Sequence, residues 1–226
     1  SLFYANKYIN NDKKWAQSVN SYLEQFSISP LQLQQGKEPL FDRISSNPGY
    51  YLTDVPRVSV IMPAFNSEKS IAHSIYSILN QTWNNIELII VDDASTDGTW
   101  QIIQSLAQED SRIKVLRNTV NVGPYVSKNR ALNHANGTYI TGHDADDWSH
   151  PQRIEKHLSA LLAEPGIKFS IAHMLRVDER GRFHNFAEKG GKITVDGAAK
   201  LASISALFEA KTFREKLGHW DSIRFG

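Results

Sequence analysis

The 226 residues are 41% hydrophobic and 22% charged, which suffices to bury the core of one large domain and excludes a disordered chain. The 25 basic and 24 acidic residues give a formal charge of +1, so the composition supplies no general attraction for nucleic acid or an anionic membrane. The absence of cysteine excludes disulfides and thiolate metal sites, and no apolar run approaches the roughly 18 residues of a membrane span. A cytoplasmic location fits this composition. Because the chain begins with Ser1, segments upstream could have been removed, and we expect a fragment.

Residues 1–52 are expected to form a helical extension. Apolar side chains recur there at helical spacing, namely Trp15, Val19, Tyr22, Leu23 and Phe26. Ser29-Pro30 and Asn47-Pro48-Gly49 interrupt the pattern and indicate a loop. We interpret the aromatic stripe as a packing face against the main domain rather than a binding site. Association with the inner face of a membrane or with a complex through this extension stays open.

From Arg57 onward, short apolar runs alternate with helical patterns, which is typical of parallel βαβ units. Residues 58–62 form the first predicted strand, which we expect Pro63 to stop. A helix capped near Ser67 should follow, with an apolar face of Ile71, Ile75, Ile78 and Leu79. The run 86–91 is too uniformly apolar for a surface strand, and it ends in Asp92-Asp93.

Two further units complete the repeat. A turn at 95–98 opens a helix that buries Ile102, Ile103 and Leu106, and a short strand covers 113–116. Asn121, Gly123 and Pro124 turn into a helix through Val126, Ala131 and Leu132, which Asn136-Gly137 ends before a strand at 138–141. In open parallel sheets the ligand lies outside the carboxyl ends of the strands. The predicted site therefore combines residues 63–66, 92–93 and 144–147.

The fourth predicted strand leads into three carboxylates, Asp144, Asp146 and Asp147. Crowded carboxylates repel one another and are costly to keep ionised, so such a cluster usually has a cation to neutralise it. Oxygen ligands favour Mg²⁺ or Mn²⁺ over zinc. The alternative is a solvated turn in which Asp147 or Ser149 caps the next helix. Pro151 would open that helix, and its apolar face would be Ile154, Leu158, Leu161 and Leu162.

The last third of the chain is less regular. Residues 168–173 resemble another strand, 176–189 a hairpin or loop excursion, and 196–207 have helical spacing. The chain stops at Gly226 without a closing element, so we expect that its C-terminal end is truncated.

Four motifs in order resemble those of family 2 glycosyltransferases of GT-A fold: IMPAFNSE (61–68), IELIIVDDASTDGT (86–99), NVGPYVSKNRAL (121–132) and GHDADDW (142–148). Each motif alone is weak, but four in this order over roughly 90 residues are specific. The resemblance covers residues 57 to about 225 and leaves the N-terminal extension unexplained. It implies an α/β fold, GT-A type, with a doubly wound, mostly parallel sheet and a Rossmann-like nucleotide-binding half. The expected domains are 1–52 and 53–226.

The resemblance also implies an inverting, metal-dependent transfer of a sugar from a nucleotide-sugar, UDP-linked in the first instance, to an acceptor hydroxyl in glycan or polysaccharide synthesis. Pro63, Ala64 and Phe65 would line the base pocket, and Asp93 would accept a hydrogen bond from the base, which suits an ionised carboxylate. The same motifs add further residues to the nucleotide-sugar site: Asn66, Glu68, Asn121, Gly123, Lys128, Asp144 and Ala145.

For the metal, Mn²⁺ or Mg²⁺, the resemblance implies that Asp146 is the main ligand. Asp144 would lie near the ribose and the metal, and Asp147 would orient or replace Asp146. The cation would neutralise the leaving nucleoside diphosphate. No catalytic base is assigned, because the family's base follows a segment resembling residues 217–221 and would lie just beyond Gly226. We therefore expect these 226 residues to bind donor and metal but to transfer sugar poorly.

Several positions depart from the family pattern or have two readings. Lys128 stands where the family commonly has Arg, so it would hold phosphate as a point charge. His143 replaces an apolar residue, and we interpret it as a hydrogen-bonded core histidine rather than a metal neighbour. Trp148 and Trp220 could face the sugar or pack beneath the loops.

Two other functions compete with sugar transfer. A nucleotidyltransferase would usually show a Gly-rich basic loop after the first strand, and the segment here reads PAFNSEKS. A non-catalytic or degenerate nucleotide-sugar-binding module is disfavoured by the intact Asp93, Asp144 and Asp146. No nucleic-acid partner is expected.

Overall fold

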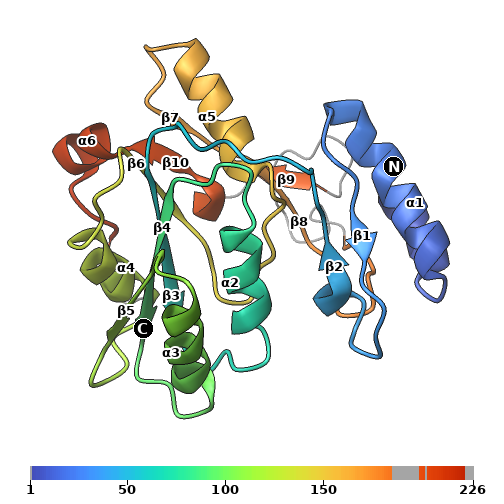
Figure 1. The fold of residues 1–226 in the computed structure, drawn as a ribbon, viewed down its shortest axis with the longest axis horizontal. Helices are drawn as coiled ribbons and strands as arrows, with labels where there is room; N and C mark the ends of the chain where they lie inside the picture. Colours follow the sequence, from blue (N-terminus) through green and yellow to red (C-terminus); the bar gives the residue numbers. More distant parts are fainter. Residues whose placement is uncertain (1, 185–198, 202, 222–226) are drawn as a thin grey trace.

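A computed structural model describes residues 2–184, 199–201 and 203–221 of the chain. Within these residues one sheet of six strands has the order β5-β4-β3-β6-β10-β7 (Figure 1). The first four strands in that order are mutually parallel, and β10 is antiparallel to both of its neighbours. The strands are β3 (Val58–Ala64), β4 (Ile86–Asp92), β5 (Ile113–Arg117), β6 (Tyr139–Gly142), β7 (Phe169–Ser170) and β10 (Leu207–Glu209).

Helices cover both faces of this sheet. Side chains of β3 and β4 at even positions pack against α2 (Ile71–Leu79), α3 (Thr99–Glu109) and α5 (Arg153–Ala163). Those at odd positions pack against α4 (Pro124–Leu132), α6 (Ala210–Thr212) and the π-helical η6 (Phe213–Leu217). Because every residue of β4 is buried, its sequence shows no polar alternation. The arrangement confirms the predicted doubly wound fold.

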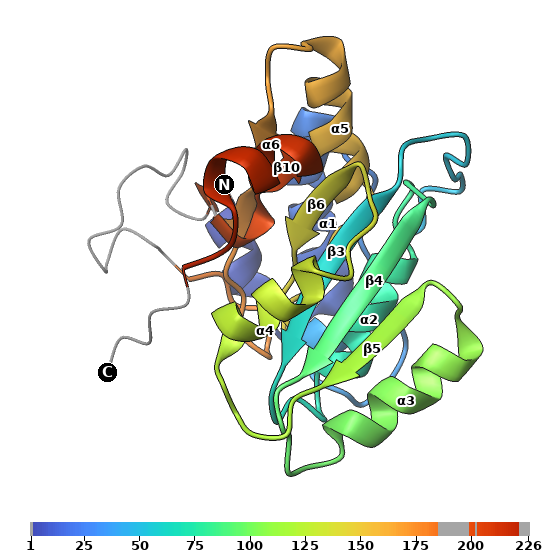
Figure 2. The same cartoon turned by 90° about the vertical axis from the view of Figure 1, so that its left-hand side faces the viewer.

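The sheet has a topological switch point between β3 and β6. From β3 the chain moves outward through β4 to β5, and it then returns to the other side of β3 to form β6 (Figure 2). The helices that follow β3 and β6, α2 and α5, lie on the same face of the sheet. In open α/β sheets the ligand binds outside the carboxyl ends of the strands at a switch point, and we call this region the crevice. The carboxylates that follow β4 and β6 lie at this edge.

Pro63 does not stop the first strand, contrary to the prediction. β3 continues to Ala64, with Pro63 opposite Val91 of β4. The pairing with β6 ends at Ile61 and Gly142. Because the backbone groups of a strand point alternately to its two neighbours, the missing N–H of Pro63 falls on the β6 side, beyond the last paired residue.

The predicted helix starts also need correction. α2 begins at Ile71 rather than near Ser67, whose carbonyl accepts hydrogen bonds from residues 70 and 71. α5 begins at Arg153 after the N-cap residue Gln152, so neither Asp147 nor Ser149 caps it. Ile154, Leu158 and Leu161 are buried as expected, whereas Leu162 is 50% exposed.

The prediction of a helix at 196–207 is wrong for the residues described there. β9 (Ala199–Leu201) pairs with β8 (His173–Leu175), a 3-10 turn covers Ser203–Ser205, and β10 follows. β10 inserts between β6 and β7, and Thr141 Oγ1 donates to Ala206 O at 3.0 Å. The open edge of β6 thus imposes extended backbone on a helix-like pattern. Residues 196–198 and 202 lie outside the described residues.

The strand expected at 168–173 is divided between β7 and β8. An antiparallel bridge joins Val177 and Phe183, which confirms a hairpin within 176–184. The remainder of the predicted excursion, 185–189, lies outside the residues described.

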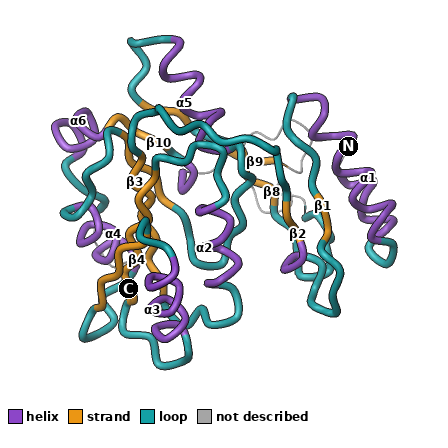
Figure 3. The backbone as a smooth tube through the Cα atoms, viewed as in Figure 1, coloured by secondary structure: helices purple, strands orange, loops and turns teal. Residues whose placement is uncertain are grey.

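The N-terminal extension is helical, as predicted, and adds a two-stranded ribbon (Figure 3). Its elements are η1 (Leu2–Tyr8), α1 (Asp12–Leu23), η2 (Glu24–Phe26), β1 (Gln32–Leu33), η3 (Phe41–Arg43) and β2 (Ile44–Ser45). Trp15 is fully buried, stacks on Phe183 at 5.8 Å and donates from Nε1 to Gly181 O at 2.7 Å. The stripe on α1 is therefore a packing face, although Phe26 is 49% exposed.

The boundary between the extension and the main domain stays a proposal at residue 52, where Leu52 N–H donates to Thr82 O at 2.7 Å. Within the described part of the chain, no helix combines the length and apolar character needed to cross a membrane.

Candidate functional site

Hydrogen bonds join the turns that follow β3 and β4 at the carboxyl ends of these strands. Asn66, at φ +48°, accepts a hydrogen bond from Thr96 N–H on Oδ1 at 2.9 Å. Glu68 accepts from Gly98 N–H on Oε2 at 2.8 Å. Two of the residues predicted to contact nucleotide therefore hold the turn after β3 against the turn after β4.

The residues expected to line a base pocket lie beside these turns. Ala64 is 1% exposed and Pro63 is half-buried at the end of β3. Phe65 is 47% exposed, so its ring is available for a flat ligand.

Asp93 is 2% exposed, and its carboxylate accepts three hydrogen bonds from the chain. Oδ1 accepts from Asn118 Nδ2 at 2.7 Å and Val122 N at 2.9 Å, and Oδ2 accepts from Gly123 N at 2.8 Å. A carboxylate offers about four acceptor positions. Asp93 therefore uses most of its acceptor positions to hold the loop 118–123.

That loop leads into α4 and places its side chains. Gly123 has φ +91°, a value that side chains disfavour, which explains glycine at the N-cap. Asn121 is exposed on the same loop. One turn into the helix, the Lys128 side chain is only 7% exposed, and its Nζ lies 3.4 Å from Asp144 Oδ1 and 5.7 Å from the centroid of the Tyr125 ring.

Asn129, the next residue of α4, contacts Trp220 rather than the acidic turn. Its side chain donates to Trp220 O and accepts from Trp220 N, both at 2.8 Å. Trp220 also packs on Phe213, with ring centroids 4.8 Å apart. Trp148 joins the apolar cluster of the N-terminal extension. Both tryptophans therefore have packing roles.

The acidic turn after β6 is fastened through its backbone. Ser74 Oγ donates to Asp144 O, and Ser70 Oγ donates to Ala145 O, both at 3.0 Å. The Asp144 side chain is 42% exposed and Asp146 is exposed. Asp147 is half-buried, and burial, followed by repulsion from Asp146 and Asp144, raises the pKa of its carboxyl to about 6.

These carboxylates fit a cation that is shared with phosphate, rather than one enclosed by protein. Among the described residues no group of three or more acidic or imidazole side chains could hold a metal. Mg²⁺ is commonly bound by one or two carboxylates together with substrate phosphates. Asp144 and Asp146 supply that hard oxygen set at the open side of the turn, and Lys128 adds a positive charge beside it.

A buried polar cluster lies beneath the acidic turn. His143 is 3% exposed, and burial together with Arg153 lowers its pKa well below the usual value, so the ring is neutral. It is a core histidine, as predicted, but its Nε2 has no hydrogen-bond partner in the described part of the structure. The same holds for His157 Nε2 and for Arg153 Nε and Nη2.

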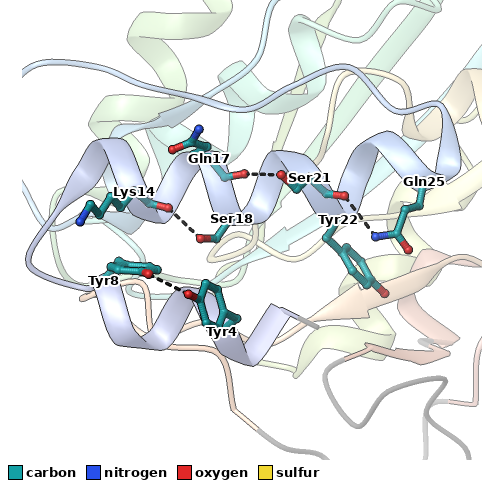
Figure 4. Close-up of a pocket in the computed structure, with 8 residues that line it drawn as sticks. All are labelled: Tyr4, Tyr8, Lys14, Gln17, Ser18, Ser21, Tyr22 and Gln25. Carbon is teal, nitrogen blue, oxygen red and sulfur yellow. Dashed lines mark hydrogen bonds between the residues drawn. The ribbon is translucent and has the colours of Figure 1, made fainter.

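A separate hollow of about 460 Å³ lies between η1 and α1, far along the chain from the acidic turn (Figure 4). Tyr4 and Tyr8 line one side, joined by a 3.0 Å hydrogen bond. On the other side Ser18 and Ser21 donate to carbonyls of their own helix. Its lining carries a single charged side chain, Lys14, and no carboxylate, so we place the chemistry in the crevice.

Sequence reasoning missed four residues that organise the site. Asn118 follows β5, so the strand-end rule that found Asp93 could have found it. Ser70, Ser74 and Arg153 lie at or near helix starts, where polar residues are expected for other reasons. Nothing in the local pattern distinguishes them.

Comparisons with known proteins agree with this geometry. The family model described as Glycosyl transferase family 2 matches residues 59–195. The protein EpsE of Bacillus subtilis is 45% identical over 127 residues, which are 56% of this chain and 46% of EpsE. The chain spans about half the length of the curated relatives it matches.

Two solved structures share the fold. Staphylococcus aureus TarS 1-349 in complex with UDP matches with a TM-score of 0.58 and 24% identity, over 74% of this chain and 50% of that one. The mannosyltransferase PcManGT from Pyrobaculum calidifontis, in complex with GDP-Man and Mn²⁺, matches with a TM-score of 0.54 and 21% identity, over 98% of this chain and 60% of that one.

Proposed function

Since this chain belongs to glycosyl transferase family 2, we propose that it serves to move a sugar, with inversion, from a nucleotide-sugar to a hydroxyl of a glycan acceptor. A UDP-sugar is the first choice of donor and Mn²⁺ or Mg²⁺ the cation. The observation that carries the proposal is the turn after β6, where Asp144, beside a buried lysine, and the exposed Asp146 follow the carboxyl end of a strand at the switch point.

The donor's parts are assigned by chemistry. The base would lie against Phe65 and the end of β3, because Phe65 presents an exposed ring beside buried backbone. Asp93 and the loop 118–123 would form the floor, since its carboxylate orients Val122 and Gly123 through their N–H groups. The TarS complex with UDP supports a UDP donor, and the complex of PcManGT with GDP-Man leaves the base open.

The diphosphate would lie between Lys128 and the acidic turn. Asp146 would hold the cation with Asp144, and the bound cation would stabilise negative charge on the leaving diphosphate. Lys128 would contribute a point charge from the opposite wall. We assign no catalytic base among residues 2–184, 199–201 and 203–221.

Calorimetric titration with UDP in Mn²⁺ or EDTA tests the proposal. Wild-type protein should bind UDP only with the cation, and Asp146→Ala should weaken that binding at least tenfold, about 1.4 kcal/mol, because the cation loses its anchor. Asp54→Ala, at an exposed aspartate before β3, is the matched control and should bind like wild type. EDTA-insensitive UDP binding would count decisively against the cation role.

A further inference from the structure

Arg153 lies at the first position of α5, directly beneath the acidic turn. Its Nη1 donates to Gly142 O, the last residue of β6, at 3.3 Å. Its Nε and Nη2 are shut off from solvent and have no hydrogen-bond partner among the described residues. A buried guanidinium with two unused donors is costly, so the structure should offer it an acceptor in some state of the turn.

The neighbouring imidazoles cannot balance this charge. His143 and His157 both have their pKa lowered by burial and by Arg153, so both rings are neutral near pH 7. His157 Nδ1 is already engaged with Ser170 Oγ at 2.6 Å. The two rings fill space around the guanidinium but leave its charge unpaired.

Asp147 is the acidic group that acts on Arg153. It is half-buried, and its negative charge opposes the lowering of the Arg153 pKa that burial causes. Among the described residues the two side chains form no ion pair, so the attraction between their charges acts at longer range.

We propose that Arg153 is a positioning residue that holds the turn 143–147 in its cation-binding shape. One edge of the guanidinium anchors the Gly142 carbonyl, and the positive charge at its unused N–H groups attracts the Asp147 carboxylate. Asp147 is then held inward, and Asp144 and Asp146 stay directed at the ligand. This inference rests on the proposed function and adds a residue that contacts neither sugar nor metal.

The variants for a test are Arg153→Met, Arg153→Lys and Asp147→Asn. Met keeps much of the length of the side chain without charge, and Lys restores a point charge but not the planar fork. The matched control is Arg112→Met, because Arg112 bridges Asp110 and Asn84 before the start of β5, at the end of the strands opposite the crevice.

Each variant is titrated with UDP in the presence and absence of Mn²⁺, and Mn²⁺ occupancy is followed by electron paramagnetic resonance. Arg153→Met should weaken Mn²⁺-dependent UDP binding about tenfold and change metal-free binding less than twofold, whereas Arg112→Met should change neither. Arg153→Lys should recover part of the loss. Equal loss with and without Mn²⁺, or no loss, would overturn the assignment, because a merely structural role would not separate the two conditions.

A double-mutant cycle without ligand makes the pairing testable on its own. The changes in melting temperature of Arg153→Met and Asp147→Asn should fail to add in the double variant by roughly 2 to 4 °C, as expected for one coupled charge pair in a chain of this size. Strict additivity would refute the pairing even if the protein binds Mn²⁺ and UDP. Coupling in a protein that binds neither would instead refute the proposed function and leave the pair standing.

Discussion

Two aspartate-bearing turns at the same edge of the sheet are built in opposite ways. After β4, Asp93 is almost completely buried, and its carboxylate accepts hydrogen bonds from Asn118, Val122 and Gly123. After β6, the described residues give the Asp144 and Asp146 carboxylates a single long contact, from Lys128 to Asp144, and the cluster beneath them contains four buried nitrogen atoms without partners in that part of the chain. The residue type is the same, but the supply of donors differs.

The difference indicates that one turn stabilises its own loop and the other is available to bind a ligand. A carboxylate that the chain already satisfies fixes its loop and has little left to offer a ligand. A turn whose negative charges have few internal donors gains most from a ligand that supplies positive charge. We therefore expect mutations at the first turn to change folding and mutations at the second to change binding.

Replacing Asp93 should give the largest effect. Asp93→Ala leaves three donors of the chain without their acceptor, so the free energy of unfolding should fall by about 2 to 4 kcal/mol. Urea unfolding followed by circular dichroism measures the loss. Asp93→Asn, which keeps one acceptor oxygen, should lose less.

An exposed aspartate of the turn after β6 provides the control for that measurement. Asp146→Ala removes an exposed carboxylate and should leave the unfolding midpoint within the usual range for surface substitutions, about 0.5 kcal/mol. Unchanged stability of Asp93→Ala together with weaker UDP binding would show that Asp93 contacts the base after all, as its position after β4 predicts.

Acid sensitivity tests the unsatisfied cluster beneath the second turn. Burial, followed by repulsion from Arg153, lowers the pKa of His157 to about 3, below its ordinary value of 6.5. The unfolded chain therefore takes up a proton as the pH falls below 6.5, whereas the folded chain does not, so stability present above pH 6.5 is lost toward pH 3. Between pH 6.5 and pH 5 this loss should reach about 2 kcal/mol.

His157→Gln should remove that part of the pH dependence, because an amide can still bond to Ser170 but does not titrate in this range. His143 is buried in the same cluster with its pKa lowered, so some acid sensitivity should remain. The exposed His134 provides the control, and His134→Gln should follow wild type in urea titrations at each pH. Parallel curves for His157→Gln and wild type would remove His157 from the acid-sensitive groups.

The sequence predicts strands that form from local patterns better than strands that depend on pairing with distant residues. Apolar periodicity places β3, β4, β5 and β6 and their helices, because these elements form from local patterns. β10 escapes prediction because its extended form depends on the free edge of β6, which no local pattern records. The continuation of β3 through Pro63 likewise depends on where β6 stops pairing.

The site shows the same limit at the level of side chains. Asp144 and Asp146 are identifiable from spacing, and so is Asp93, but the use of Asp93 by its own loop requires the fold. Arg153 follows a helix start in an amphipathic pattern, where an arginine ordinarily faces solvent. Here its Nη1 donates to the carbonyl of Gly142 at the end of β6, a tertiary contact that spacing alone does not reveal.

Lys128 connects the two turns, and we expect the smallest effect from replacing the tyrosine beside it, Tyr125. It belongs to the helix that Asp93 helps to position, yet its ammonium lies 3.4 Å from Asp144. The Tyr125 ring lies 5.7 Å from that ammonium and is 47% exposed. A ring in this place partly shields the charge from water and so strengthens its attraction for an anion.

Tyr125→Ala should therefore weaken Mn²⁺-dependent UDP binding about three- to tenfold, roughly 0.7 to 1.4 kcal/mol, without shifting the unfolding midpoint beyond the surface range. Tyr125→Phe retains the ring and should bind nearly as wild type, which separates the ring from its hydroxyl. Tyr76, on α2, is 45% exposed and is not one of the residues assigned to the site. Tyr76→Ala therefore controls for the loss of a surface tyrosine. If Tyr125→Ala and Tyr76→Ala bind UDP equally well, the lysine reaches the diphosphate without help from the ring, and the loop shaped by Asp93 contributes only Lys128 to the second turn.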